Sequence, residues 1–253
     1  MQRNRPWVTV NVAATADGKL APVDRGLTNF GGAEDRALME QLRAAADAVL
    51  IGSGTLKAED PPLLILNQAL REARQVQRGG PHPLNVTVCS HLPATLAEMR
   101  FFLHPETEKL VFTSVQTPPE LRALAARYAA VEVVPLDAAG HLDLAEVMRR
   151  LAEKGVQNLL LEGGGELNFS MLAAGLVDEL YLTVCPLLFG GRTAPTPFDG
   201  EGLPTSQVRR LDLLSYRPGH QGQVFLHYRL QSPDANLAGH KNTDQDHHAE
   251  FES

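Results

Sequence analysis

The chain has 253 residues, of which 43% are hydrophobic and 21% are charged, a composition typical of a globular protein with a sizeable core. Its formal net charge of -7 argues against a nucleic-acid-binding surface, because such a surface needs clustered Lys and Arg. No stretch has the length and apolar character of a membrane span or a secretory leader, so we expect a cytoplasmic protein without a membrane partner.

The first two thirds of the chain alternate between strand-like and helical patterns. The predicted strands are residues 7–13, 48–51, 84–88, 109–113, 131–134 and 156–161. The predicted helices are residues 33–46, 63–77, 118–128, 142–154 and 166–174. Strands that alternate with helices form parallel sheets whose two faces are both covered. The pattern therefore predicts a three-layer α/β/α fold with a mostly parallel sheet.

The last third of the chain changes character. Three strand-like segments, at 178–185, 208–215 and 223–230, have no convincing helix between them. We expect them to add antiparallel strands to one edge of the same sheet, in a single domain of residues 1–230. Residues 231–253 are polar and lack the apolar side chains that offset ordering entropy, so we expect a disordered tail.

The sequence does not indicate a metal site or a disulfide bond. Cys89 and Cys185 lie far apart in apolar runs and form no CxxC pair, so we expect two buried, reduced thiols. In the tail, His247, His248 and Glu250 have ligand chemistry, but no scaffold would fix their geometry. We therefore predict no metal site.

Two segments share one design, in which an apolar strand runs into glycines and then into a helical pattern. The first continues from Ile51 as Gly-Ser-Gly-Thr, and the second continues from Glu162 as Gly-Gly-Gly. Such turns let the backbone approach a phosphate, and the helix N-terminus offers free N–H groups. The alternative is that the glycines merely permit tight turns, since neither segment is a GxGxxG fingerprint or a P-loop. The two turns would meet at one pyrophosphate only if their strands are neighbours.

Several short segments together resemble the reductase domain of riboflavin biosynthesis. They are ATADGK (14–19), LRAAADAVLIGSGT (42–55), EDP (59–61), LEGGG (161–165), GLVDEL (175–180) and PLLFGG (186–191), and they follow the family's order over residues 6–230. The resemblance implies a dihydrofolate-reductase-like fold that is usually dimeric and uses NADPH. It also implies a reaction in which hydride reduces the ribosylamino group of a 5-phosphorylated aminopyrimidine to a ribitylamino group, with the opened sugar held as an imine.

The resemblance assigns roles at the reaction to Lys19 and Asp60, and the strand pattern adds Glu162. Lys19 would hydrogen-bond the substrate near the reacting sugar, although a solvated loop lysine is the alternative. Asp60 would lie beside C1′ of the sugar and the nicotinamide, the alternative being a turn residue before Pro61. Glu162 follows three leucines at the carboxyl end of a buried strand, where open α/β sheets bind ligands, so we assign it to substrate or nicotinamide contact.

The remaining assignments concern the cofactor and the substrate phosphate. The residues expected at the cofactor phosphates are Gly52, Gly54, Thr55, Gly163, Gly164 and Gly165. Ser90 is a candidate partner for the adenosine 2′-phosphate, and a turn-forming Ser is the alternative. Arg43 is a candidate ligand of the substrate phosphate. By analogy with dihydrofolate reductases, the resemblance also predicts a cis peptide bond between Gly163 and Gly164.

The chain departs from the family pattern at two points. The Arg that usually follows the Asp-Pro step and holds the substrate phosphate is absent, and Leu66 stands there instead. The H-x-E and P-C-x-x-C motifs of the zinc deaminase domain are also absent, so we expect no deamination by this chain. The missing Arg leaves open a reductase of the same fold that acts on dihydrofolate or another pterin. A nucleotide-binding protein without catalysis is a further alternative.

Overall fold

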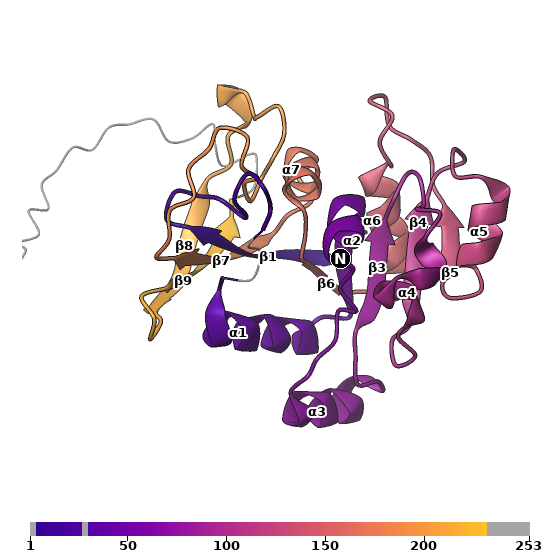
Figure 1. The fold of residues 1–253 in the computed structure, drawn as a ribbon, viewed down its shortest axis with the longest axis horizontal. Coiled ribbons are helices and arrows are strands. Elements are labelled where there is room, and N and C mark those ends of the chain that lie inside the picture. The colour runs from indigo at the N-terminus through magenta and orange to yellow at the C-terminus, as the bar shows by residue number, and fades with distance from the viewer. Residues whose placement is uncertain (1–3, 27–29, 232–253) are drawn as a thin grey trace, which may run out of the picture.

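The computed structural model describes residues 4–26 and 30–231, so the predicted tail lies almost wholly outside the described residues. Within them, nine strands form one sheet in the order β5-β4-β3-β2-β6-β1-β7-β9-β8 (Figure 1). The strands are β1 (Trp7–Thr15), β2 (Ala48–Gly52), β3 (Leu84–Val88), β4 (Lys109–Thr113), β5 (Ala130–Val133), β6 (Asn158–Leu161), β7 (Glu179–Cys185), β8 (Leu211–Pro218) and β9 (Val224–Leu230). The neighbouring strands from β5 through β4, β3, β2, β6 and β1 to β7 all pair in parallel, whereas β9 pairs antiparallel with both β7 and β8. The mostly parallel sheet with an antiparallel C-terminal edge is confirmed.

Helices cover both faces of the sheet. They are α1 (Gly32–Ala45), α2 (Ser53–Glu59), α3 (Gln68–Arg78), α4 (Arg100–Leu103), α5 (Pro119–Ala125), α6 (Leu144–Glu153) and α7 (Gly165–Ala173). Short 3₁₀ turns lie at Leu96–Glu98 and Thr205–Gln207. Buried side chains of α6 and α7 pack on one face, and those of α2, α4 and α5 pack on the other, with Leu42 of α1 beside them. None of the helices in the described part of the chain is long and apolar enough to span a bilayer.

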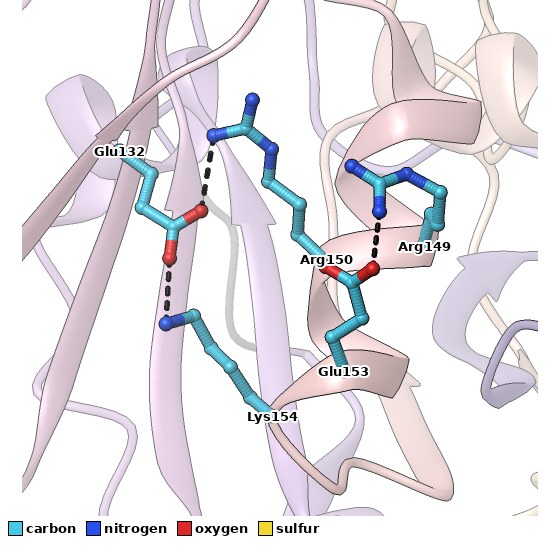
Figure 2. Close-up of a pocket in the computed structure, with 5 residues that line it drawn as sticks. All are labelled: Glu132, Arg149, Arg150, Glu153 and Lys154. Carbon is cyan, nitrogen blue, oxygen red and sulfur yellow. Dashed lines mark hydrogen bonds and ion pairs between the residues drawn. The ribbon is translucent and has the colours of Figure 1, made fainter.

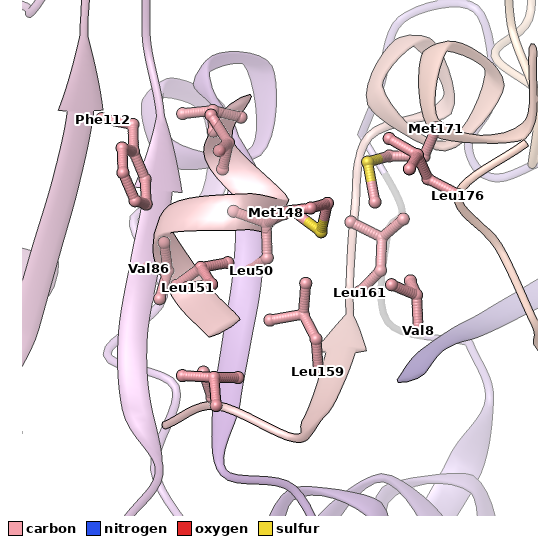
Figure 3. Packing of buried hydrophobic residues seen from close by; sticks show 14 of the residues in the cluster. Val8, Leu50, Val86, Phe112, Met148, Leu151, Leu159, Leu161, Met171 and Leu176 are labelled. Carbon is pink, nitrogen blue, oxygen red and sulfur yellow. The ribbon is translucent and has the colours of Figure 1, made fainter. Parts of the chain in front are cut away.

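The core follows from the apolar runs of the central strands. All five residues of β2 are buried, as expected for a parallel strand covered on both faces. On the face covered by α6, Leu50 and Leu161 of neighbouring strands pack with Met148 and Leu151 (Figure 3). The two alternating sets of side chains on each central strand therefore fill two apolar clusters, one on each face.

One predicted helix begins later than expected. Helix α3 starts at Gln68 and not at residue 63, because the Asn67 side chain caps it by accepting a hydrogen bond from the Leu70 amide at 3.1 Å. The residues before it form no regular secondary structure, and they bury Leu63 and Ile65 in the protein interior. The sequence pattern placed a helix after the first Gly-rich turn without giving its bounds, and this is the seven-residue helix α2, whereas it missed the four-residue helix α4.

The sheet topology brings the functional segments to one edge. Strand β6 lies between β2 and β1, with Leu161 paired to Leu50 on one side and to Val10 on the other. Because parallel strands end at the same edge of a sheet, the loops that follow β1, β2, β3, β6 and β7 emerge together. These loops carry the candidate site residues.

Candidate functional site

The two Gly-rich turns touch each other. The Gly52 amide donates a hydrogen bond to the Gly163 carbonyl at 3.1 Å, just after the last paired residues of strands β2 and β6. The Glu162 amide likewise donates to the Leu50 carbonyl at 3.0 Å. The condition set by the sequence, that the strands of both turns be neighbours, is met.

The second turn depends on glycine conformation. Gly163 and Gly164 have φ values of +132° and +76°, which residues with a side chain rarely adopt. A Cβ on Gly163 would also lie 3.1 Å from the Thr55 hydroxyl oxygen of the first turn. The predicted cis bond between Gly163 and Gly164 is wrong, because the described residues contain no cis peptide bond. The chain makes the turn through the two positive φ angles instead.

The arrangement suits a phosphate group. Helix α7 has Gly164 at its N-cap and no side-chain cap, so its first N–H groups are available to a ligand. The Thr55 hydroxyl lies against the same turn. A Cβ on Gly165 would overlap the Thr196 carbonyl oxygen, whereas a Cβ on Gly54 would meet nothing within 4 Å. The turns therefore form a cradle of backbone amides and one hydroxyl, which are the kinds of donor that bind phosphate groups.

Ser90 lies on the neighbouring loop. It follows β3, whose last residue Val88 pairs with Gly52, so Ser90 emerges beside the first turn. Its carbonyl accepts hydrogen bonds from the Ser114 and Thr117 hydroxyls at 2.9 and 3.0 Å. These bonds fix the Ser90 backbone while its half-buried side chain keeps some solvent exposure.

Glu162 and Arg43 form a buried ion pair. Two guanidinium nitrogens of Arg43 donate to the two carboxylate oxygens of Glu162 at 2.7 and 2.6 Å, and a third donates to the Leu64 carbonyl at 2.6 Å. The two side chains are only 9% and 8% exposed. Burial opposes the charge on Arg43, but the Glu162 carboxylate outweighs it and raises the pKa of the guanidinium. Arg43, expected at the substrate phosphate, is thus directed at Glu162 in this structure.

Two further acids lie near Glu162, and the sequence pattern missed both. The pKa of Glu59 is raised, first by the protein atoms that surround its carboxyl group and then by the charge of Glu162. Averaged over all its atoms, the residue is nevertheless exposed. Burial also raises the pKa of Asp35, with a smaller contribution from Glu162. An acid in the first turn of a helix usually indicates only a favourable interaction with the helix dipole, so the sequence did not mark Asp35 as a site residue.

Asp60 lies at the end of α2, where it adopts a left-handed φ of 45°. Its two carboxylate oxygens accept hydrogen bonds from the amides of Arg100 and Phe101 at 2.6 and 2.9 Å. Asp60 therefore caps the short helix α4. Its side chain remains 25% exposed, so each oxygen keeps capacity for a further donor.

Lys19 lies where the loops after β1 and β7 are joined. The Asp17 carboxylate accepts hydrogen bonds from the amides of Phe189 and Gly190 at 3.2 and 2.6 Å. A hydrogen bond from the Thr15 hydroxyl, together with the Gly190 amide, lowers the pKa of Asp17 to about 2. The Lys19 ammonium is 3.5 Å from the Ala194 carbonyl oxygen of the same loop. Asp17 thus holds the two loops together, and Lys19 extends between them.

A surface hollow lies elsewhere on the described part of the molecule. It measures about 420 Å³ and is lined by Glu132, Arg149, Arg150, Glu153 and Lys154 (Figure 2). Each of these side chains forms an ion pair with another of them. Strands β4, β3 and β2 separate Glu132 of β5 from the turn after β6. This hollow is a charged surface network, and the Gly-rich edge of the sheet is the better candidate site.

Comparison with known proteins identifies the family of the chain. A family model described as the RibD C-terminal domain matches residues 6–225. A protein of Archaeoglobus fulgidus is 37% identical over 78% of this chain and 88% of its own length. A protein of Methanothermobacter thermautotrophicus is 36% identical over 79% of this chain and 86% of its own length. Both are named 2,5-diamino-6-ribosylamino-4(3H)-pyrimidinone 5′-phosphate reductase.

Solved structures share the fold. A pyrimidine reductase-like protein of Corynebacterium diphtheriae superposes with a TM-score of 0.74 at 21% identity, covering 90% of this chain and 93% of that one. A Thermotoga maritima deaminase and 5-amino-6-(5-phosphoribosylamino)uracil reductase gives a TM-score of 0.70 at 20% identity. This match covers 90% of the present chain, which spans only 57% of the bifunctional protein.

Proposed function

The chain belongs to the RibD C-terminal domain family, and we propose that it is the NADPH-dependent reductase that converts the ribosylamino group of a 5-phosphorylated aminopyrimidine into a ribitylamino group. The two archaeal relatives, whose lengths it covers almost fully, are named for this type of reaction on a diaminopyrimidinone. The observation that carries the proposal is the hydrogen bond between Gly52 and Gly163, which joins two phosphate-binding turns into one cradle. A nicotinamide bound there supplies hydride when reduced.

The residues of the site have separate tasks in this proposal. The turns of Gly52, Gly54 and Thr55 and of Gly163, Gly164 and Gly165 bind the cofactor pyrophosphate through backbone amides and one hydroxyl. Ser90 lies on the next loop and binds the 2′-phosphate that distinguishes NADPH from NADH. If so, Ser90→Asp weakens NADPH binding by charge repulsion and leaves NADH binding almost unchanged, as measured by dissociation constants for the two cofactors.

Lys19, Asp60 and Glu162 act at the substrate. Lys19 donates a hydrogen bond near the reacting sugar. Asp60, oriented by the amides of Arg100 and Phe101, uses its remaining acceptor capacity for a sugar hydroxyl. Glu162 is held in one orientation by Arg43 and contacts the substrate or the nicotinamide ring. In this arrangement Arg43 reaches a substrate phosphate only if it leaves Glu162.

Three broader predictions complete the proposal. We expect residues 1–230 to behave as one domain, with residues 231–253 as a polar extension. We expect a homodimer, for which the edge strand β8 offers the exposed apolar side chains Leu213 and Tyr216. We also expect the protein to reside in the cytoplasm with the other enzymes of small-molecule synthesis.

The decisive experiment is an absorbance assay of NADPH oxidation by the purified protein. The proposal predicts turnover with the phosphorylated ribosylaminopyrimidine and little turnover with dihydrofolate. Tight NADPH binding without oxidation by any phosphorylated ribosylaminopyrimidine would contradict it. Comparable kcat/KM for dihydrofolate would favour the pterin alternative that the missing Arg at Leu66 leaves open.

A further inference from the structure

Asp35 is a second carboxylate at the Glu162 end of the sheet. It lies in the first turn of α1 and folds back over Gly31, where a Cβ would overlap its carboxylate. Its charge interacts with that of Glu162, which follows β6, and with the buried thiol of Cys185 at the end of β7. Because β1 lies between β6 and β7, Asp35 is positioned near the carboxyl end of β1, within the site already described.

The surroundings of Asp35 contain polar atoms without partners. Thr183 on β7 is 1% exposed, and its hydroxyl forms no hydrogen bond of ordinary length, although it is close enough to Asp35 to lower the pKa of the carboxyl. On the neighbouring strand β1, the side-chain oxygen of Asn11 is also buried without a partner. Buried polar atoms are almost always hydrogen-bonded, so these two atoms on paired strands are available to a ligand.

Asp35 also lacks a cation. Glu162 is neutralised by Arg43, whereas Asp35 forms no ion pair within residues 4–26 and 30–231, and Arg36 acts on it only through longer-range attraction. A partly buried carboxylate without a paired cation is costly unless a ligand supplies hydrogen-bond donors. The group that fits must therefore bring N–H donors to Asp35.

We propose that Asp35 binds the C2 edge of the substrate pyrimidine and selects a 2-aminopyrimidinone over a uracil. This inference rests on the proposed reductase function. In a 2-amino-4(3H)-pyrimidinone, the 2-amino group and N3–H are adjacent donors, and they match the two oxygens of a carboxylate in a bidentate pair. In a uracil, a carbonyl oxygen replaces the amino group and faces one carboxylate oxygen without a hydrogen between them.

The discrimination follows from this single exchange of donor for acceptor. A site built to receive an N–H group rejects an analogue that lacks it, because a buried polar atom is then left unpaired. Asn at position 35 would offer one acceptor and one donor, which matches N3–H and the C2 carbonyl of a uracil. Asp35→Asn keeps the shape of the side chain, so it should shift the substrate preference from the 2-aminopyrimidinone to the uracil without disturbing the packing on Gly31.

The test compares the two pyrimidines in two ways. The first measures kcat/KM for NADPH oxidation with the 2,5-diaminopyrimidinone and the 5-aminouracil ribosylamino 5′-phosphates. The second measures, by calorimetry without NADPH, the dissociation constants of the two corresponding ribitylamino products. We expect the wild type to favour the diamino compound and Asp35→Asn to shift the ratio towards the uracil by at least about 100-fold. Glu34→Gln removes a charge from the same helical turn, where Glu34 binds Arg217, and should leave the ratio unchanged.

Thr183→Val provides a second variant that keeps the packing, and it should weaken binding of the diamino product. If the Thr183 hydroxyl were only structural, its removal would leave product binding unchanged. The inference is overturned if the wild type has no preference for the diamino product, if neither product binds, or if Asp35→Asn leaves the ratio unchanged. Failure of the reductase function is seen separately, as product binding without NADPH oxidation by the wild type.

Discussion

The Gly52 amide and the Gly163 carbonyl are joined by a 3.1 Å hydrogen bond, which makes one structure of two turns that lie 111 residues apart in the chain. Each turn alone is compatible with a simple change of chain direction. Their contact depends on the pairing of β2 with β6, and it aligns the start of α7 with the Thr55 hydroxyl. The phosphate cradle is therefore a property of the sheet order.

Gly165→Ala tests the cradle directly. The added Cβ would overlap the Thr196 carbonyl oxygen, so the start of α7 must shift and its amides leave their positions. We expect the dissociation constant for NADPH to rise by about tenfold or more, which corresponds to ~1.4 kcal/mol. Gly80→Ala is the matched control, since its Cβ would meet no atom closer than 3.8 Å. Equal NADPH affinity in both variants would exclude the start of α7 from the cofactor site.

Arg43→Ala should strongly destabilise the protein. It would leave the Glu162 carboxylate buried without its cation and the Leu64 carbonyl without its donor. Removing one partner of a buried ion pair costs about 3–5 kcal/mol, whereas an exposed pair contributes about 0–1 kcal/mol. Arg149→Ala, at an exposed pair, is the control. Urea unfolding of the two variants measures the difference, and equal free energies of unfolding would show that the Arg43 pair is not structurally important.

Asp60→Asn and Glu59→Gln test the acids at the end of α2. Asn offers one acceptor oxygen where Asp60 uses two, so the first variant should keep one of the two hydrogen bonds to α4 and lose some stability. We expect Asp60→Asn to lower kcat/KM by about tenfold or more, the size of one lost hydrogen bond to a charged group, and Glu59→Gln, at an acid without an assigned substrate contact, to lower it less. The assay is NADPH oxidation, accompanied by thermal unfolding. Unchanged kcat/KM with a lowered melting temperature would leave the residue concerned with a structural role alone.

The stability contributed by Asp17 to the loops of the site depends on pH. Its pKa is about 2 in the folded protein against an ordinary value of 3.8, because Thr15 and the Gly190 amide bind the charged form. A lowered pKa means that this stabilisation is complete above the ordinary value and is lost as the pH falls towards 2. We therefore expect the melting-temperature difference between wild type and Asp17→Asn to be largest above pH 4 and to shrink on acidification. A difference that stays constant with pH would contradict this assignment.

The sequence predicted the sheet well because its strands are continuous apolar runs. The predicted limits of β3 and β4 match the structure, and those of β2 differ by one residue. Local patterns could not give the bounds of α2 or reveal α4, since helices of seven and four residues are too short for a hydrophobic period. Helix α3 was placed too early because Leu63 and Ile65 are buried by tertiary packing and not by helix formation.

The candidate site was only partly predictable. Strand ends and glycines located the two turns, but their contact required the strand order, which no local pattern contains. The resemblance located Lys19 and Asp60, yet gave no indication that Asp60 caps α4. The pairing of Arg43 with Glu162 joins residues 119 positions apart, and Asp35 becomes notable only through its neighbours on other elements.

The most direct test of the account is the initial rate of NADPH oxidation by the purified chain with 2,5-diamino-6-ribosylamino-4(3H)-pyrimidinone 5′-phosphate, with dihydrofolate measured in parallel. We expect rapid oxidation with the diaminopyrimidinone, formation of its ribitylamino product, and strong loss of the rate in Lys19→Met. No oxidation of NADPH with this compound or its uracil counterpart, by a folded protein that binds NADPH, would contradict it.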